Sequence, residues 1–348
     1  MTFAGKNSGR RDFVKRAVQS CAGVVLLSSL PEWLNPRKEP KGAYIERGCF
    51  AMGTVVTISS YGESREHVLD ATTKAFDEIR RIDRLMSVYQ PSSQLSIVNR
   101  SASRKPVVVD NDLVEIIKYA NRYGALTNGE FDITVEPLME LWGFREEETG
   151  PLPMPTDREL ATAIEAVGIK KILVDEKECT ISLLNPHCRI DLGGIAVGYS
   201  VDRAVKILKA EGIESAFINH SGDVYALGYP ENCEGWEIGI PNPLSPQEMV
   251  RTLSLRDRAL STSGNYENFV TYGGNKYGHI MDPKTGHPSS RLLSLSIVSD
   301  TSITADALST GVFVMGIEKG RDFTCTQEGL NLIAIVEQEG REEVVSTF

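Results

Sequence analysis

The chain has 348 residues, of which 41% are apolar and 24% are charged, an ordinary composition for a globular protein with a sizeable core. Its 37 Lys and Arg residues are outnumbered by 47 Asp and Glu residues, so the formal net charge is −10. This balance excludes proteins that hold nucleic-acid phosphates on a basic surface. We therefore expect no nucleic acid among the partners.

The N-terminal segment carries a pattern typical of twin-arginine export signals. Arg10 and Arg11 precede an apolar stretch from Ala17 to Leu30. This stretch is shorter than the roughly 20 residues that a membrane-spanning helix needs. We interpret residues 1–30 as a signal that is cleaved or kept as an anchor, and a basic amphipathic helix is the alternative. The pattern predicts a protein of the periplasm or of the outer face of the cytoplasmic membrane, with peripheral attachment to that membrane left open.

A short linker separates this segment from the folded body. Residues 31–43 are rich in Pro, Lys and Glu, a composition typical of connecting segments. The domain is therefore expected to cover residues 44–348.

The first elements of the domain combine strands with long helices. Two strand-like runs between Tyr44 and Ser60 flank Met52-Gly53-Thr54. From Glu63 to Met86, apolar residues recur at steps of three and four, which predicts a long amphipathic helix. A second helix is predicted for Asn111–Tyr123, where Asp110 is the N-terminal cap.

Proline and glycine residues divide the middle of the chain into shorter elements. A helix is predicted near Thr156–Val167, and Lys171–Asp175 with Cys179–Leu184 are predicted to form a hairpin. A strand at Arg189–Leu192 is predicted to run into Gly193 and Gly194, before a helix at Ala196–Glu211.

The C-terminal part alternates short β runs with glycine turns. A helix is predicted near Ile303–Met315 and a closing strand at Asn331–Val336. Clusters of strands with irregularly interspersed helices favour an α+β fold. The cysteines show no C-x-x-C spacing, which argues against a zinc site. A single disulfide between Cys179 and Cys188 is left as a possibility.

Two patterns indicate a metal ion and a pyrophosphate. Asp306 and Thr310 are four residues apart, on one face of the predicted helix, and two oxygen groups at that spacing can bind a hard cation such as Mg²⁺. Alternatively, they are a solvated acid and a hydroxyl bonded to its own helix. Gly193 and Gly194 before a helix start predict a cradle for phosphate oxygens, although glycine pairs also make ordinary turns.

A third pattern supplies an acid or base. His279 precedes Asp282-Pro283-Lys284-Thr285-Gly286, a sequence that favours a hairpin turn. An imidazole can transfer protons near neutral pH, so His279 is a candidate acid or base. No G-x-S-x-G elbow and no Walker lysine pattern occurs, and His220-Ser221-Gly222-Asp223 is too compact for a catalytic triad.

The order of the short motifs resembles that of the ApbE family of FAD:protein FMN transferases over about residues 45–340. The resemblance implies mixed and antiparallel sheets with flanking helices and a flavin site between subdomains. It also implies an enzyme that binds FAD and Mg²⁺, transfers FMN to a Ser or Thr hydroxyl of an acceptor protein, and releases AMP. The matching motifs are Met52 to Thr54, Ser87 to Tyr89, Gly129 to Leu138, Leu141 to Phe144, Asp191 to Tyr199, Gly222-Asp223, Thr262 to Tyr266, His279 to Gly286 and Ala305 to Thr310.

The resemblance also implies roles for individual residues. The implied metal ligands are Asp306, Thr310 and backbone oxygens of Ser309 and Gly194. His279 is the implied handler of the acceptor hydroxyl's proton, so His279 and Asp306 are the catalytic pair. The residues expected to contact the cofactor are Met52, Tyr89, Glu130, Phe131, Asp132, Asp191, Gly193, Gly194, Val197 and Ile280.

One departure from the family pattern leaves two alternatives open. Val197 stands where many members carry a lysine, and Lys276 or Arg291 could supply the missing cation. A non-catalytic periplasmic FAD-binding protein is one alternative, and a metal-dependent FAD pyrophosphatase is the other. For the transferase, the expected acceptors are electron-transfer subunits of the cell envelope.

Overall fold

The computed structural model describes residues 25–26, 42–145, 154–245, 247–265, 268–290, 292–338 and 341–348. The predicted signal segment and linker lie outside these residues, apart from strand β1 (Val25–Leu26) and residues 42–43. Within the described residues, no helix has both the length and the apolar content that crossing a membrane would require.

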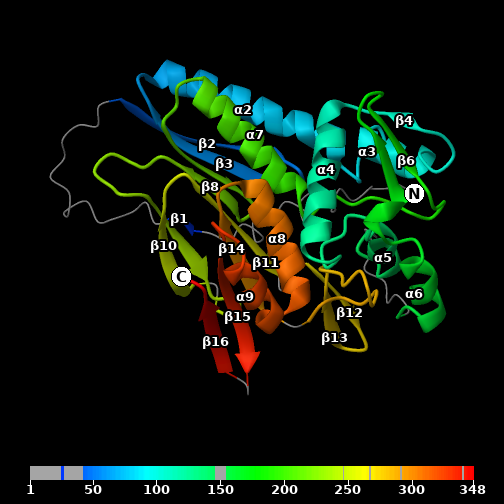
Figure 1. The fold of residues 1–348 in the computed structure, drawn as a ribbon. Coiled ribbons are helices and arrows are strands. Elements are labelled where there is room, and N and C mark those ends of the chain that lie inside the picture. The colour runs from blue at the N-terminus through cyan, green and yellow to red at the C-terminus, as the bar shows by residue number, and fades with distance from the viewer. Residues whose placement is uncertain are drawn as a thin grey trace, which may run out of the picture.

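An eight-stranded antiparallel sheet forms the centre of the molecule (Figure 1). The strand runs predicted on both sides of Met52 are its β2 and β3, which confirms that prediction. The strand order is β16 (Arg341–Ser346), β15 (Asn331–Gln338), β14 (Ser294–Ser299), β11 (Arg258–Gly264), β8 (Asp223–Leu227), β7 (Ser215–His220), β3 (Thr54–Gly62) and β2 (Ala43–Ala51).

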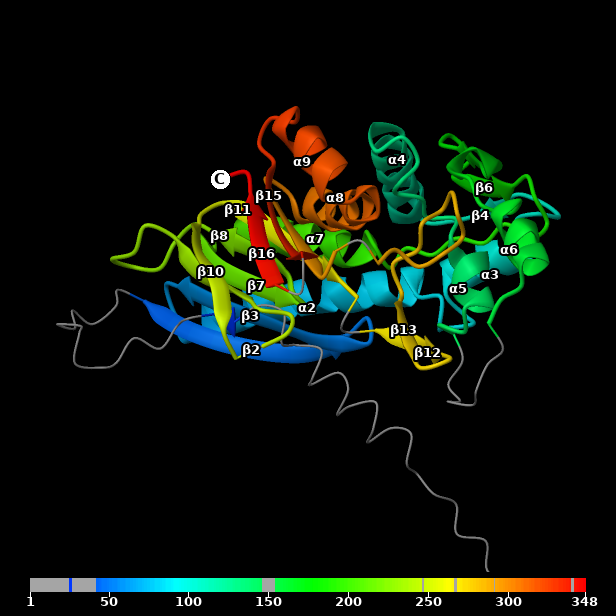
Figure 2. The ribbon, with the colours of Figure 1, turned by 90° about the horizontal axis from the view of Figure 1, so that it is seen from below.

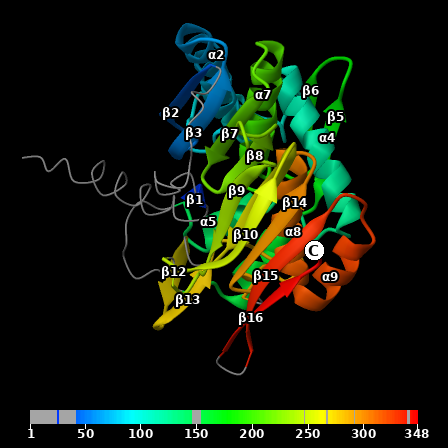
Figure 3. The same cartoon turned by 90° about the vertical axis from the view of Figure 1, so that its left-hand side faces the viewer.

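Helices cover one face of this sheet, as Figure 2 shows. They are α2 (Arg65–Met86), α7 (Ala196–Ala210) and α8 (Ser302–Met315), with α9 (Ile317–Cys325) next to α8. The other face packs on β9 (Trp236–Pro241) and β10 (Met249–Leu255), which pair with each other, and β9 also pairs with β1 (Figure 3).

Alternating side chains connect the sheet to both layers. On β15, Leu332 and Ala334 join the core under the helices, whereas Ile333 joins the second core beneath β9 and β10. Phe217 does the same on β7. Because successive residues of a strand point to opposite faces, both faces of this sheet must be apolar. For the same reason β8 and β14 are buried along their whole length, on both faces of the sheet.

The remaining elements form the end of the molecule that carries α5 and α6 (Figure 1). The predicted helices around residues 111–123 and 156–167 and the predicted hairpin are confirmed, as α4, α6 and β5–β6. These elements are α3 (Gln94–Ser101), β4 (Val107–Val108), α4 (Asn111–Leu126), α5 (Glu136–Leu141), α6 (Asp157–Ile164), the 3-10 turn at Ile169–Lys171, β5 (Ile172–Asp175), β6 (Thr180–Leu183), β12 (Phe269–Tyr272) and β13 (Asn275–Gly278).

The segment before the glycine pair differs from its prediction, because Arg189–Leu192 is extended but pairs with no strand. Its hydrogen bonds go elsewhere. The side-chain amide of Asn99 donates to Ile190 O and accepts from Ile190 N, both at 2.8 Å, and Asp191 N donates to Ile133 O at 2.8 Å. A side chain therefore takes the place of a neighbouring strand.

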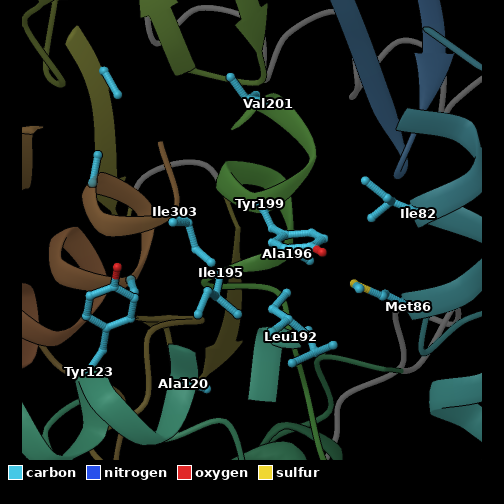
Figure 4. Close-up of a cluster of buried hydrophobic side chains, with 14 of the residues drawn as sticks. Ile82, Met86, Ala120, Tyr123, Leu192, Ile195, Ala196, Tyr199, Val201 and Ile303 are labelled. Carbon is cyan, nitrogen blue, oxygen red and sulfur yellow. The ribbon is translucent and has the colours of Figure 1, made fainter. Parts of the chain in front are cut away.

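The core holds this segment in place. Figure 4 shows Leu192, Ile195 and Ala196 among side chains from α2, α4, α7 and α8. Cys188, at the start of the same stretch, is buried, and Cys179 is half-buried. Both are free thiols, so they form no disulfide with each other. The bend that contains Gly193 and Gly194 thus emerges from a packed core.

Candidate active site

Helices α7 and α8 approach each other closely enough to exclude a side chain. A methyl group on Gly198 would lie 2.4 Å from Ser302 O and 2.8 Å from the Cβ of Asp306, so glycine is required there. Asp202 of α7 accepts hydrogen bonds from the N–H groups of Ser302 and Ile303 at 2.8 and 2.9 Å. It thereby caps the start of α8 from the neighbouring helix.

Asp306 lies at this junction as a buried carboxylate. It is 5% exposed, and its Oδ2 accepts a hydrogen bond from Gly198 N at 2.9 Å. Burial raises the pKa of Asp306 well above its ordinary value, and the negative charges of Asp223 and Asp202 raise it further. No basic side chain among the described residues offsets these effects. A bound cation would supply the missing positive charge.

Hydroxyl groups of α8 and β11 cluster beside the backbone of Asp306. Ser309 Oγ donates to Asp306 O at 2.9 Å, and Ser263 Oγ of β11 lies 2.8 Å from Ser309 Oγ and 3.4 Å from Thr310 Oγ1. A methyl group on Gly194 would lie 3.0 Å from Thr310 Oγ1. The structure therefore places the glycine bend against the face of α8 that carries Thr310, as the predicted site requires. We call Gly194, Gly198, Asp306, Ser309 and Thr310 the α7–α8 wall.

The chemistry of this wall fits a hard cation. Across the described ranges, no three His, Cys, Asp or Glu side chains gather so that they could hold a metal ion. The available donors are one carboxylate, a threonine hydroxyl and backbone carbonyls, the oxygen set that suits Mg²⁺ and that zinc sites rarely use.

A second group of residues, which we call the Arg145 rim, consists of Tyr89, Glu136, Arg145, Asp191 and His279. Arg145 donates to Glu136 Oε1 at 2.8 Å, to Asp191 Oδ2 at 2.6 Å and to the Tyr89 hydroxyl at 2.8 Å. The other oxygen of Asp191 accepts from Gly193 N at 2.8 Å. The Gly193 N–H is thus engaged by the protein and is not free to donate to the phosphate predicted at this bend.

Glu136 and Arg145 were not predicted as site residues, although Glu136 lies within the Gly129 to Leu138 motif. Glu136 is 5% exposed, and burial raises its pKa to about 7 against the opposing effect of Arg145. The only signal that could have found Arg145 is its position directly after the Leu141 to Phe144 motif.

His279 faces the same rim. Its Nδ1 lies 3.3 Å from Asn268 O, and electrostatic interactions with Asp191 and Arg145 act on its ring. Burial lowers the pKa of His279, so its imidazole is neutral at pH 7 and able to accept a proton. The turn predicted after it is confirmed, since Gly286 N donates to Asp282 O at 2.9 Å.

Three other predicted residues, in the segment after α4, are tied to the protein itself. Phe131 is 3% exposed, and its ring packs beside Gly194, so it supports the bend from inside. Asp132 accepts from Thr134 N at 2.8 Å and from Ile169 N at 3.0 Å. Glu130 forms an ion pair with Lys284 at 2.8 Å.

The last predicted contacts differ in exposure. Met52 is partly buried and has a left-handed backbone (φ 50°) in the two-residue turn that joins β2 and β3. Ile280 is buried, and Val197 is half-buried in the first turn of α7. Of the two substitute cations, Lys276 has its Nζ 4.2 Å from the centre of the Phe269 ring, and Arg291 lies outside the described residues.

Comparisons with known proteins give the class first. The structure is similar to the flavin transferase ApbE of Vibrio cholerae, with a TM-score of 0.77, 29% identity and coverage of 88% of this chain and 97% of that one. It is also similar to the ApbE protein of Thermotoga maritima, with a TM-score of 0.79, 33% identity and coverage of 86% and 96%. The α+β fold and its mixed, antiparallel sheet architecture are thereby confirmed as those of flavin transferases.

Sequence comparisons then give the family. The model of the ApbE family matches residues 52–334. The chain is 33% identical over 271 residues to an FAD:protein FMN transferase of Vibrio cholerae, which covers 77% of this chain and 80% of that relative. It is 29% identical over 291 residues to one of Salmonella typhimurium, covering 82% and 83%. The chain belongs to the ApbE family.

Proposed function

We propose that this enzyme transfers the FMN half of FAD to a Ser or Thr hydroxyl of an acceptor protein, with Mg²⁺ as its metal ion, and releases AMP. Family membership and relatives named as FAD:protein FMN transferases support the transferase activity. The observation that carries the metal part of the proposal is the meeting of Gly194, Thr310 and buried Asp306 at the start of α7.

The α7–α8 wall would hold the metal ion. Asp306, the Thr310 hydroxyl and backbone oxygens of Ser309 and Gly194 are the proposed ligands. When bound, Mg²⁺ neutralises charge on the pyrophosphate of FAD. The close approach at Gly198 keeps α7 and α8 at a fixed separation, so the ligands from the two segments are already arranged before FAD arrives.

The Arg145 rim would bind the flavin nucleotide and manage the proton. Tyr89 exposes its ring, which suits stacking on a flat heteroaromatic, and Asp191 offers a carboxylate beside the glycine bend. Neutral His279 would accept the proton of the acceptor hydroxyl as its oxygen bonds to the FMN phosphorus. The bond between that phosphorus and the bridging oxygen breaks, and AMP leaves with that oxygen.

The test is transfer with a defined acceptor. Purified enzyme, FAD, Mg²⁺ and an envelope electron-transfer subunit should give a flavin-fluorescent acceptor band and one AMP per flavin transferred. Replacing the acceptor Ser or Thr by Ala should remove the label, and EDTA should prevent it. A full panel of such acceptors without label, with FAD bound and Mg²⁺ present, would contradict the proposal.

The same reaction mixture separates the two alternatives. A half-buried apolar Val197 in place of a cation favours the FAD-binding protein without turnover, which would retain FAD and form no AMP. A pyrophosphatase would release FMN and AMP when the acceptor is left out, because water would take the place of the hydroxyl. Retention of the FAD spectrum and free FMN by chromatography are the two measurements.

We also propose that residues 1–30 export the enzyme to the periplasmic side of the cytoplasmic membrane, where envelope acceptors are accessible. The paired Arg10 and Arg11 support this proposal. Replacing both arginines by lysine should leave the enzyme in the cytoplasmic fraction. Unchanged export of that variant would contradict a twin-arginine route.

A further inference from the structure

Arg145 has more partners than any other side chain of the rim. Its guanidinium donates to Glu136 and Asp191 and, through its third nitrogen, to the hydroxyl of Tyr89. The same group lies 5.3 Å from the centre of the Tyr89 ring. Its side chain is 16% exposed and those of Glu136 and Asp191 are 7% and 14% exposed, so the two ion pairs are formed largely out of water, whereas the contact with Tyr89 lies at the surface. Hydrogen bonds of charged groups are stronger and more directional in such surroundings.

The partners come from segments that are distant in the chain. Tyr89 follows α2, Glu136 begins α5, and Asp191 precedes the glycine bend. Arg145 is 56 residues from Tyr89 and 46 from Asp191 in sequence. A planar fork of five N–H donors can fix such groups at set angles, which a lysine cannot do.

The local charge balance distinguishes positioning from phosphate binding. One guanidinium faces two carboxylates, Glu136 and Asp191, and so carries no surplus positive charge. A cation that replaced the lysine missing at Val197 would need that surplus to attract the pyrophosphate. Arg145 is therefore not a substitute for that lysine, and its effect on FAD must pass through the side chains that it holds.

We propose that Arg145 is a positioning residue that pre-arranges Tyr89 and Asp191 for FAD. The inference rests on the proposed function, since it takes those two side chains as contacts of the flavin nucleotide. Holding the exposed Tyr89 ring in one orientation removes rotational freedom before binding, so less entropy is lost when FAD arrives. Glu136 is buried and accepts from Nε and Nη2 of the guanidinium, which keeps Arg145 itself in place.

The experiment measures FAD binding and transfer in variants of the full-length enzyme. Arg145→Gln should raise the Kd and the KM for FAD about 10- to 100-fold, as expected for lost charged hydrogen bonds, and leave kcat close to its original value. With FAD saturating, flavin fluorescence should be brighter, because a freed Tyr89 ring quenches it less. Arg145→Lys should recover only part of the affinity. Arg321→Gln, on an exposed α9 arginine whose one ion pair within the described residues spans 4.0 Å, is the matched control and should change nothing.

A second variant separates positioning from stability. Arg145→Gln leaves Glu136 buried without its partner, whereas Arg145→Gln with Glu136→Gln removes both charges. The double variant should regain thermal stability and still bind FAD weakly. Tyr89→Phe keeps the ring and loses the hydroxyl, and should reproduce part of the fluorescence change.

Two results would overturn the inference. One is unchanged FAD affinity and fluorescence in the double variant, and the other is tighter FAD binding, which would mean that Arg145 competes with FAD for Asp191. Failure of the proposed function gives a different result: the unaltered enzyme would then bind FAD but label no acceptor.

Discussion

At the α7–α8 wall the side chains are small and buried, with Asp306 5% and Ser309 1% exposed, whereas at the Arg145 rim the ring of Tyr89 is 69% exposed. The wall is shaped by backbone contact and by the absence of a side chain at Gly198. The rim is shaped by long side chains that reach one another through charge. Packing fixes the wall, whereas ion pairs fix the carboxylates of the rim and leave Tyr89 open to solvent. The difference suits a site where a metal needs fixed ligands and a large ligand needs an entrance.

The largest effect should follow from removing the carboxylate of the wall. Asp306→Asn should lower the transfer rate about 10³-fold, equivalent to about 4 kcal/mol, because the main anionic ligand for Mg²⁺ is lost. Burial raises the pKa of Asp306 in the folded protein above its ordinary value of 3.8. Without metal, ionisation of Asp306 therefore lowers the free energy of unfolding as the pH rises from 3.8 to the raised pKa.

The metal-free variant should therefore melt at a higher temperature than the metal-free original enzyme at pH 7. Adding Mg²⁺ should raise the melting temperature of the original enzyme only. A variant that still gains stability from Mg²⁺ would show that the ion binds elsewhere.

A methyl group on Gly198 should push α7 and α8 apart without removing any of the proposed metal ligands. Gly198→Ala would place a methyl group 2.4 Å from Ser302 O, and we expect a loss of about 3 kcal/mol in the free energy of unfolding, typical of an overpacked core. Chemical denaturation measures it. The control is Gly212→Ala, where nothing lies within 4 Å but φ is +78°, so only about 1 kcal/mol should be lost. Equal losses in the two variants would argue against a tight α7–α8 contact.

On the rim, replacing the proposed proton acceptor His279 should lower the transfer rate and leave Mg²⁺ binding unchanged. His279→Gln should lower kcat about 100-fold, equivalent to about 2.7 kcal/mol. The pKa of His279 is below its ordinary value of 6.5. The rate of the original enzyme should therefore rise with pH and then level off, and the midpoint of the rise should lie below pH 6.5. The variant should lack this dependence. The same pH profile in both proteins would assign the proton to another group.

The smallest effect should come from a hydroxyl behind the wall. Ser263→Ala removes the 2.8 Å contact with Ser309, and should weaken Mg²⁺ binding about fivefold, equivalent to about 1 kcal/mol. Thr262→Ala is the matched control, because Thr262 points to the other face of β11 and contacts Ser296 at 2.8 Å. Titrations with Mg²⁺ monitored by melting temperature compare the two. A larger effect in the control would mean that the strand as a whole supports the site.

The periodic parts of the fold could be predicted from the sequence. Long apolar stripes predicted α2, α4 and α7, because an apolar stripe over several turns indicates a helix that packs on a core. Helix α8 was also predicted, but it is buried on nearly all sides and has no such stripe. The short helices α3, α5 and α9 were not predicted, since one or two turns show too little period. The predicted strand at Arg189–Leu192 was wrong because the Asn99 side chain binds its backbone.

The candidate site also has a part that could be predicted from the sequence and a part that could not. The wall could be predicted, since Asp306 and Thr310 share one helix face and glycine pairs have few backbone roles. The link from Arg145 to Tyr89 and Asp191 could not, because it depends on tertiary folding that joins distant segments. The roles assigned to these residues remain predictions for the experiments above.

The hydrogen bond from the Gly198 amide to Asp306 places a spectroscopic probe inside the enzyme. An amide proton that donates to a carboxylate changes its resonance frequency when that carboxylate gains a proton or a divalent ion. With glycine isotopically labelled and the Gly198 signal assigned among those of the 30 glycines, that signal would record occupancy directly, without FAD, acceptor or turnover. Ion loading could then be followed separately from every later event at the site.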